Sequence, residues 1–314
     1  MWDFFWRRLT GLIVVMALVA TLVFFLTRLA PGDPAALMLG DQASAADIAA
    51  LRAVYGLDQP VLVQFGLWLK EILKGNLGQS IFLQRPVTQA LMERAEPTFF
   101  LALFSVLIAA LIGIPAGIVS AVWRGRLVDQ IVSALAMISA NIPSFWLGLL
   151  FIQFFAVKWH LFPVAGYGDP GAPLLERLRH LVLPATVLGL VNSALITRFT
   201  RASMLDILSE DFIRTARSKG LAEGVVIWRH AFGNALIPVI TVVGLTAALL
   251  VGGAIVTETV FGLPGIGNLV VSAVLRRDYP VIQGALIVVA AIYVLINLVV
   301  DLIYAWVDPR VRAQ

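Results

Sequence analysis

The stretch DFIRTARSKGLAEGVVIWRHAFGNALIP, residues 211–238, is the longest basic and polar interval between two strongly apolar runs of the chain. Its first part carries the signals of a short helix. Ser209 stands where an N-cap would be, acidic residues follow it, and two basic residues precede Gly220. Beyond Gly220, apolar residues recur at spacings of four, three and four, which predicts a second helix. These residues are Leu221, Val225, Trp228 and Phe232.

The composition is that of a membrane protein. Hydrophobic residues make up 60% of the chain, charged residues only 13%, and the mean hydropathy is +0.92. The net charge of +4 is modest and the basic residues cluster between apolar runs, which indicates a membrane orientation signal rather than nucleic-acid binding. Because the chain has no cysteine, it has no disulfide framework, thiolate metal site or cysteine nucleophile.

Six apolar runs are long enough to cross a hydrocarbon layer of roughly 30 Å. They are Leu9–Leu29, Thr98–Val122, Val128–Val157, Leu181–Ser203, Ala235–Thr257 and Val281–Trp306. The first run resembles a signal peptide in position, but it exceeds the usual apolar length of about 7–15 residues and lacks a clear small-residue cleavage site. We therefore predict an all-α membrane protein with six transmembrane helices, the first of which is a retained anchor.

Two polar stretches lie on the side opposite to residues 211–238. Pro31–Pro97 is predicted to be a long first extracytoplasmic loop with a weakly amphipathic segment at Ala45–Tyr55. Glu258–Pro280 contains Leu269–Arg276, a short apolar helix that would dip into the outer face. We divide the chain into residues 1–97, the first transmembrane helix with its extracytoplasmic segment, and residues 98–307, a five-helix core that contains the 211–238 loop.

Basic residues predict the orientation of the chain. With a cytoplasmic N-terminus, the inner segments hold twelve Lys and Arg residues, whereas the two short outer loops hold five. The long loop is left out because long loops cross the membrane largely regardless of their charge. We therefore expect both termini, and the 211–238 loop with them, to face the cytoplasm.

Four pieces of the loop match a known pattern. Ile213–Arg217, Lys219–Leu221, Arg229–Ala231 and Asn234–Pro238 resemble, in residue order and spacing, the cytoplasmic coupling (EAA) loop of the membrane subunits of ABC importers, in the form found in the dipeptide/oligopeptide/nickel group. Contact with lipid headgroups alone would not require this order. Other segments are similar to the same group: Arg28–Ala35, Tyr55–Pro60, Gly75–Ser80, Glu258–Pro280 and Asp308–Arg312. The chain departs from the group's pattern at Phe212, Ser218 and Gly233, and the Glu-Ala-Ala triplet is present only as Arg214–Thr215–Ala216.

The resemblance implies a type I ABC importer permease in a bacterial plasma (inner) membrane. It also implies a complex with a second homologous permease subunit, two cytoplasmic ATPase subunits and an extracytoplasmic substrate-binding protein. ATP and Mg would be used by the ATPase subunits, because this chain has no G-x-x-x-x-G-K-[ST] sequence. We predict no cofactor and no catalytic residue in the chain itself.

The resemblance also assigns roles within the loop. Phe212 and Ala216 would fill an apolar groove of the ATPase, the basic residues would set register and charge complementarity, and Gly220 would permit the sharp turn. The predicted coupling residues are Phe212, Arg214, Thr215, Ala216, Arg217, Lys219 and Gly220.

Side chains within the spans indicate how a substrate would cross. The span centres hold no ionisable residue, and the nearest charged ones are predicted to lie toward the inner ends: Asp129, Arg198, Arg201 and Asp301. Neutral polar residues remain, which could line a hydrated path or hydrogen-bond between helices. We predict a translocation path that includes Asn141, Ser144, Asn192, Ser193 and Thr241. Pro143 and Pro184 are predicted to interrupt the third and fourth spans, and Gly113 and Gly117, with Pro115 between them, to make at most a kinked helix contact.

Other functions require groups that the sequence lacks. A stand-alone secondary carrier or membrane enzyme would need ionisable or nucleophilic residues at mid-depth. The three histidines lie in loops or span ends on different sides of the membrane, so no metal site is predicted. The resemblance favours short peptides as the substrate and leaves nickel, glutathione and oligosaccharides open.

Overall fold

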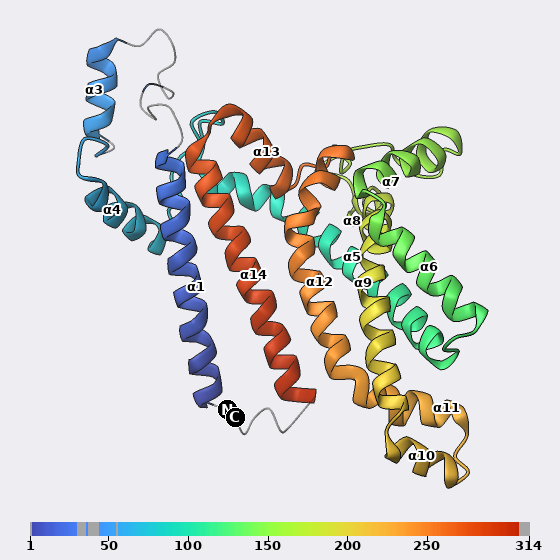
Figure 1. The fold of residues 1–314 in the computed structure, drawn as a ribbon. Coiled ribbons are helices and arrows are strands. Elements are labelled where there is room, and N and C mark those ends of the chain that lie inside the picture. The colour runs from blue at the N-terminus through green and yellow to red at the C-terminus, as the bar shows by residue number, and fades with distance from the viewer. Residues whose placement is uncertain (1, 30–35, 37–43, 55, 308–314) are drawn as a thin grey trace. The chain divides into compact units, whose positions relative to one another are not determined.

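The computed structural model describes residues 2–29, 36, 44–54 and 56–307, and it is almost entirely helical (Figure 1). Among the described residues the only β-pairing is an isolated bridge between Gln79 and Pro86. The Pro31–Pro34 turn and the closing segment 308–312 lie outside the described residues. The all-α class predicted from the composition is confirmed.

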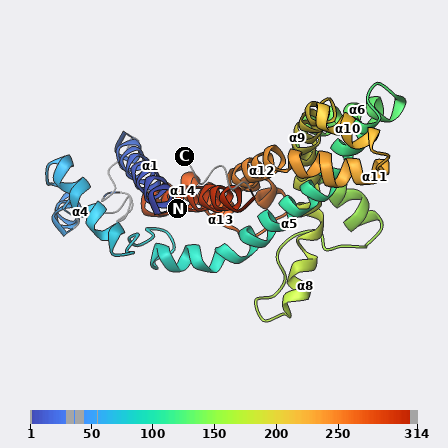
Figure 2. The same ribbon diagram turned by 90° about the horizontal axis from the view of Figure 1, so that it is seen from below.

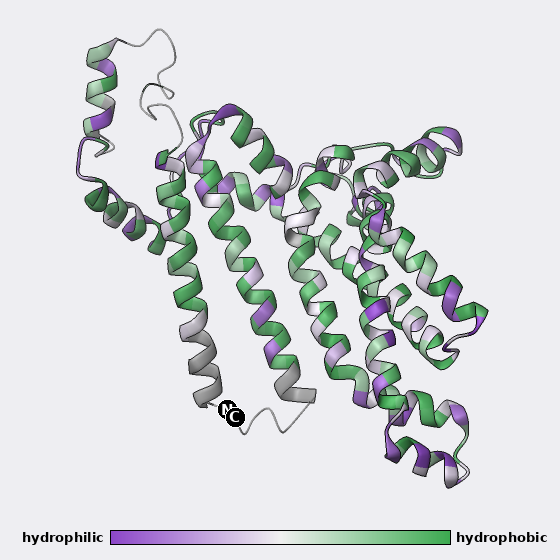
Figure 3. Ribbon diagram, viewed as in Figure 1, coloured by the Kyte–Doolittle hydropathy of each residue, from purple (hydrophilic) through white to green (hydrophobic). Residues whose placement is uncertain are grey.

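Five helices are long and apolar enough to cross a membrane, and their apolar character is visible in Figure 3. They are α1 (Trp2–Leu29), α5 (Val87–Val122), α9 (Val182–Leu208), α12 (Gly233–Val260) and α14 (Tyr279–Val307). A sixth crossing is available if α6 (Leu127–Asn141) is counted with α7 (Ser144–Phe151) and its π-helical continuation η1 (Ile152–Lys158). The predicted spans therefore all coincide with helices. Their ends differ by at most five residues, except that α1 starts seven and α5 eleven residues earlier than predicted.

The third span is bent, where the sequence analysis predicted one run. The axes of α6 and α7 differ by 98° at the break between Asn141 and Ser144. Pro143 causes this break, because its ring excludes the α conformation for the preceding residue, and Ile142 is accordingly extended at ψ 124°. Pro184 does not interrupt the fourth span. It occupies the first turn of α9, where a missing N–H removes no helical hydrogen bond.

The chain forms two compact units, of which the first combines Met1–Glu96 with Pro264–Val294. The predicted division at residue 97 falls one residue from the end of its N-terminal part, but the grouping with Pro264–Val294 is not visible in the sequence. This unit holds α1, the first turns of α5 and most of α14, together with α3 (Ala45–Val54), α4 (Val61–Leu73) and α13 (Ile266–Arg276). Its core joins the start of α5 to α13 and α14 through Val87, Leu269 and Ala285.

Asp278 fixes the loop before α5 onto the turn between α13 and α14. Its carboxylate, 2% exposed, accepts hydrogen bonds from Ser80 Oγ (2.5 Å) and from the backbone N–H groups of Ile81 (3.2 Å) and Phe82 (3.1 Å). A carboxylate buried in this way is stabilised by its donors, so the two segments are tied together although nearly two hundred residues separate them.

The second unit consists of Pro97–Leu263 and Leu295–Gln314, and α9 is at its centre. This helix packs against α6, α7 and α12, and buried side chains follow it from Leu183 to Met204. Two glycines of α5, Gly113 and Gly117, allow a close approach of α5 to α9. A Cβ at Gly113 would lie 2.7 Å from Ile196 Cβ, and one at Gly117 would lie 2.6 Å from Thr200 Cβ. The motif that was predicted to make only a kinked contact therefore forms a close crossing, because Pro115 is accommodated in a continuous helix.

Candidate functional site: the 211–238 loop and its support

The loop forms the compact helical pair that its sequence predicts, at the ends of α9 and α12 (Figures 1 and 2). It consists of α10 (Asp211–Ser218), α11 (Glu223–Val225) and a π-helical turn η2 (Val226–Phe232) that runs into α12. Gly220 separates the two parts with φ +76°, a left-handed conformation that favours glycine. The cap prediction was wrong: Ser209 ends α9, donating from Oγ to the carbonyl of Asp206 (2.7 Å), and Glu210 is the N-cap of α10.

One face of the loop is buried in its own unit. Ile213 is fully buried and Ala216 is 7% exposed, and both pack with Met204 of α9 and Ile118 of α5. Ala216 therefore cannot fill a groove of another protein together with Phe212, as the sequence analysis proposed. Ile213 and Ala216 are three positions apart, so it is these two that share the inner face of α10.

Four apolar side chains of the loop are exposed among its charged and polar residues. Phe212 is 43% exposed and Trp228 57% exposed, and Leu221 and Val225 are similarly open. The predicted stripe of Leu221, Val225, Trp228 and Phe232 is therefore mainly exposed. The buried positions of the second part are Val226 and Ala231, five residues apart, which a wider π-helical turn brings to one side.

Several polar residues of the loop are paired with one another. Arg217 pairs with Glu223 across the Gly220 turn, from Nη2 to Oε1 (2.6 Å) and from Nε to Oε2 (3.2 Å). This two-pronged contact raises the pKa of Arg217 above its usual value. Arg214 pairs with Asp211 (3.2 Å) on the surface, and Thr215 Oγ1 donates to the carbonyl of Asp211 (3.0 Å). Lys219 is exposed beside the turn.

An ion pair that the sequence analysis did not identify joins the helix ends against which the loop packs. Arg201 of α9 donates from Nε and Nη2 to the two carboxylate oxygens of Asp129 on α6, at 2.7 and 2.8 Å. Ser120 Oγ of α5 (2.5 Å) and the N–H of Gly125 (2.9 Å) donate to the same carboxylate. The side chain of Asp129 is only 7% exposed. One acceptor thus joins α5, α6 and α9, and the same ends of α5 and α9 pack against the loop.

The predicted path residues differ in their surroundings. Asn141 and Thr241 are exposed, Ser144 and Asn192 are half-buried, and Ser193 is 5% exposed at the contact of α9 with α5. The hydrogen bonds of four of them stay within one helix, to the carbonyl three or four residues earlier. Ser193 is therefore a helix-packing residue, whereas Asn141 and Ser144 flank the bend of the third span.

One buried carboxylate lies near the end of a membrane-spanning helix. Glu258, in the last turns of α12, is fully buried and accepts a hydrogen bond from Thr98 Oγ1 (2.6 Å). Within the described part of the chain, no three His, Cys, Asp or Glu side chains are grouped as a metal site would require.

Comparison with known proteins agrees with this architecture. The family of binding-protein-dependent transport system inner membrane components matches residues 113–313, and its N-terminal part matches residues 1–102. A probable peptide ABC transporter permease protein, y4tP, of Sinorhizobium fredii is 43% identical over 307 residues, covering 98% of both chains. A glutathione transport system permease protein, GsiC, of Pectobacterium atrosepticum is 44% identical over 312 residues, covering 99% of both chains.

A solved structure shows the same fold. A chain of the methionine ABC transporter MetNI in an inward-facing conformation aligns with a TM-score of 0.60 and 20% identity, over 70% of this chain and 97% of that one. At this identity the likeness concerns the fold alone, and it supports the type I permease arrangement predicted for the helices.

Proposed function

Because the chain belongs to the family of binding-protein-dependent transport system inner membrane components, the membrane subunits of ABC importers, we propose that it transmits ATPase movements through the 211–238 loop. The observation that carries this proposal is the two-sided loop. Ile213 and Ala216 anchor it to α5 and α9, while the side chains of Phe212 and Trp228 are exposed and available to a partner. A displacement of the loop's exposed side would be transmitted to the membrane-spanning helices through packed side chains, because protein interiors are close-packed and have low compressibility.

The basic residues of the loop complete this docking face. Arg214 and Lys219 would set charge complementarity with the ATPase, and Thr215 would hold the first turns of α10 together. Arg217 acts within the loop instead, since its pair with Glu223 braces the two parts. ATP and Mg would be bound by the partner subunits and not by this chain.

Replacement of Gly220 by Val should separate ATP hydrolysis from transport. A β-branched residue at φ +76° costs on the order of 1–2 kcal/mol, which would displace α10 relative to η2 without touching the spans. Nothing lies within 4 Å of an added Cβ, so the cause would be the backbone and not a clash. We expect substrate uptake by the reconstituted complex to fall several-fold while its ATPase rate is largely retained.

Gly224 supplies the matched control for this measurement. It lies in the same loop, its Cβ position is also open, and its φ is not positive. Gly224→Val should therefore transport at nearly the wild-type rate. Normal uptake by Gly220→Val would remove Gly220 from the coupling mechanism.

The translocation path would run beside the bend of the third span, with Asn141, Ser144, Asn192 and Thr241 along it. Of the original set, Ser193 is excluded from the test because leucine there would disturb the α5–α9 contact. We expect the combined replacement of Asn141 and Thr241 by Leu to reduce uptake at least tenfold, because dehydrating a path removes the water that a polar substrate exchanges for protein contacts. The matched control is Thr21→Leu, an exposed threonine of α1 that also donates within its helix. Unchanged transport by the double variant would place the path elsewhere.

We propose that both termini and the loop face the cytoplasm of a bacterial cell whose plasma membrane the chain spans. The excess of Lys and Arg in the segments assigned to the inside supports this orientation. Since the chain has no cysteine, single cysteines can report it. A membrane-impermeant maleimide should label Ser44→Cys in intact cells and should label Ser218→Cys only after the membrane is opened, and the reverse pattern would refute the orientation.

Short peptides are the proposed substrates, with glutathione, itself a small peptide, as the alternative that the relatives also favour. The complex would contain a second homologous permease, two ATPase subunits and an extracytoplasmic binding protein. Calorimetric titration of the cognate binding protein with peptides and glutathione would distinguish the substrates. Reconstitution of this chain without its partners should give no transport, whereas a stand-alone carrier would be active.

A further inference from the structure

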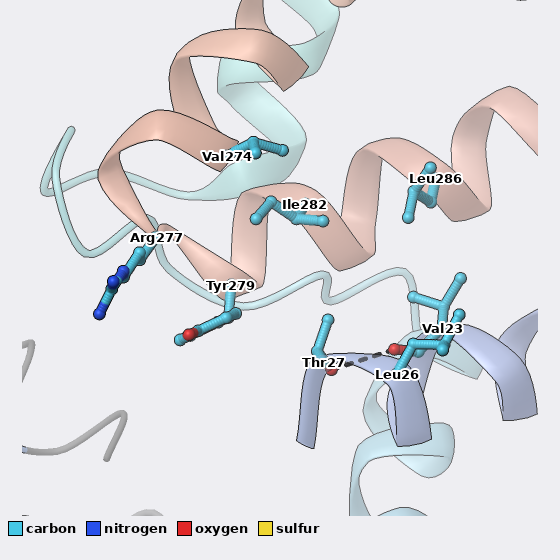
Figure 4. A pocket seen from close by; sticks show the side chains of 8 residues that line it. All are labelled: Val23, Leu26, Thr27, Val274, Arg277, Tyr279, Ile282 and Leu286. Atoms are coloured by element: carbon cyan, nitrogen blue, oxygen red, sulfur yellow. Dashed lines mark hydrogen bonds between the residues drawn. The ribbon is translucent and has the colours of Figure 1, made fainter. Parts of the chain in front are cut away.

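The helix α4 lies at the edge of the first unit, on the flank of the membrane-spanning helix α1. Figures 1 and 2 both show α1 between α4 and α14. Toward α14, α1 borders an apolar cleft of about 320 Å³ that is lined by side chains of both helices, among them Leu26 and Leu286 (Figure 4). Gln283 of α14 also donates from Nε2 to Thr27 Oγ1 of α1 (2.5 Å). α14 thus holds α1 from one side, and α4 packs against a different part of its surface.

The contact between α4 and α1 determines the depth at which α4 lies. The ring centroids of Phe65 and Trp68 of α4 are each 5.2 Å from that of Phe24 of α1. Phe24 lies five residues before the end of α1, which at a rise of 1.5 Å per residue is about 7.5 Å along the helix axis. Because Phe24 belongs to the apolar run Thr10–Leu29, which is long enough to cross a membrane, α4 lies beside the C-terminal part of that run.

Polar contacts hold both ends of α4 to the turns that flank it. Gln64 donates from Nε2 to the carbonyls of Leu57 (3.1 Å) and Gln59 (2.8 Å), which precede the helix. Near the other end, Lys74 donates from Nζ to Oε1 of Glu71 (2.6 Å). The helix is therefore anchored at its ends and by its rings, and the side that it turns outward is fixed.

The side of α4 that is turned away from these rings is mainly apolar. Residues at spacings of four, four and three share it: Leu62, Gly66, Lys70 and Leu73. Leu62 is 75% exposed and Leu73 80% exposed, and Val63 beside them is also exposed. Lys70 is the only charged residue among these five. A helix that turned this side to water would be expected to carry polar residues on it, so the exposed leucines call for an apolar cover.

We propose that α4 lies in the surface of the bilayer, at the boundary between headgroups and acyl chains, with Leu62 and Leu73 against lipid. Its depth carries the proposal, because about 7.5 Å falls within the roughly 5–10 Å to which interfacial helices bury their apolar side. The long side chain of Lys70 would extend its ammonium to the lipid phosphates. Trp68 has the ring type that is enriched at this level. In the orientation proposed above, this is the outer leaflet.

A lipid layer fits this side of α4 better than a protein partner does. Since α4 packs on the flank of a membrane-spanning helix, its opposite side faces the same layer of the membrane as Phe24 does. Protein–protein interfaces surround an apolar centre with a polar rim, whereas this side holds one charged residue. A substrate-binding protein would approach from the water beyond the end of α1.

The test places single cysteines in a chain that has no natural one, within the complete complex in lipid vesicles. Gly66→Cys carries a small environment-sensitive fluorophore between the two leucines, where an added Cβ meets nothing within 4 Å. Leu18→Cys, exposed near the middle of the apolar run of α1, is the reference in lipid, and Ala50→Cys, exposed on α3, is the reference in water. We expect lipids that carry a nitroxide near the headgroup to quench Gly66→Cys about threefold more strongly than Ala50→Cys, and aqueous iodide to do the reverse.

A second variant tests whether the leucines cause this contact. Leu62→Glu combined with Leu73→Glu should at least halve the quenching of Gly66→Cys by lipid and increase its quenching by iodide, because two carboxylates oppose insertion. The matched control is Ala46→Glu combined with Ala49→Glu, at exposed positions of α3, which should leave both signals unchanged.

Four outcomes would overturn the proposal. Equal quenching of Gly66→Cys and Ala50→Cys would place α4 in water. Protection of Gly66→Cys from both quenchers would mean that another subunit covers this side of α4. Protection from iodide that begins only when the binding protein is added would identify a docking site for that protein. Unchanged lipid quenching in the double glutamate variant would show that Leu62 and Leu73 do not hold α4 in the membrane.

Discussion

The Asp129→Asn variant should lose about 2–3 kcal/mol of unfolding free energy in the assembled complex, because Arg201 would remain half-enclosed without its counter-ion. The carboxylate accepts from Arg201, Ser120 and Gly125, and an amide in its place would turn an N–H group toward some of these donors. This loss is smaller than the roughly 3–5 kcal/mol expected for breaking a fully buried pair, because the Arg201 side chain is 31% exposed. Denaturant titration in lipid nanodiscs would measure the loss.

A double variant separates the ion pair from simple packing. Asp129→Leu with Arg201→Met removes both charges and should recover much of the stability lost by either change alone, because hydrophobic replacements of buried pairs are often tolerated. The control is Arg214→Met, which breaks the exposed pair with Asp211 and should change stability by less than about 0.5 kcal/mol. Wild-type stability of Asp129→Asn would show that Ser120 and Gly125, and not the charge, hold the three helices.

The position of this ion pair connects stability with transport. Ser120 lies near the end of α5, Arg201 near the end of α9, and the loop residues Ile213 and Ala216 pack on the same two helix ends. If the contacts of Asp129 with α5 and α9 are weakened, movement of the loop would displace only the nearby helix ends and not the membrane-spanning helices as a whole. Asp129→Asn is therefore expected to lower uptake per ATP hydrolysed as well as stability.

Within the described residues, hydropathy predicted each helix that is long and apolar enough to cross a membrane, because an apolar run of this length is stable in a bilayer as a helix. The 211–238 loop was identified for a different reason, namely that its order of residues matches a known family. Helical spacing failed to predict which residues of α10 are buried, because contacts with other helices determine the buried side. Ala216 and Phe212 share a helical spacing, yet Met204 and Ile118 cover only the side that holds Ile213 and Ala216.

The contacts that the sequence did not reveal join distant residues. Asp129 and Arg201 are 72 positions apart, and each on its own resembles a charged span end. Pro264–Val294 joins the N-terminal part of the chain through pairs such as Ser80 and Asp278, and no local pattern predicts such a pairing. The bend at Asn141–Ser144 was only partly foreseen, since Pro143 predicts a break but not an angle of 98°.

The α5–α9 crossing should be highly sensitive to added volume at Gly117. In Gly117→Ala the new Cβ would lie 2.6 Å from Thr200 Cβ and 2.7 Å from the carbonyl of Thr197, and neither neighbour is the free end of a flexible side chain. The helices must separate, at a cost of about 1–3 kcal/mol, and Gly117→Leu should prevent assembly. Thermal unfolding and the yield of intact complex would report both effects.

Gly253→Ala on α12 is the matched control for this crossing. Its Cβ would meet nothing within 4 Å, so the higher helix propensity of alanine should leave stability unchanged or raise it by up to about 1 kcal/mol. The same substitution is thus expected to act in opposite directions on two helices of one unit. If both variants were equally stable, the close approach of Gly117 to Thr200 would not hold in the membrane.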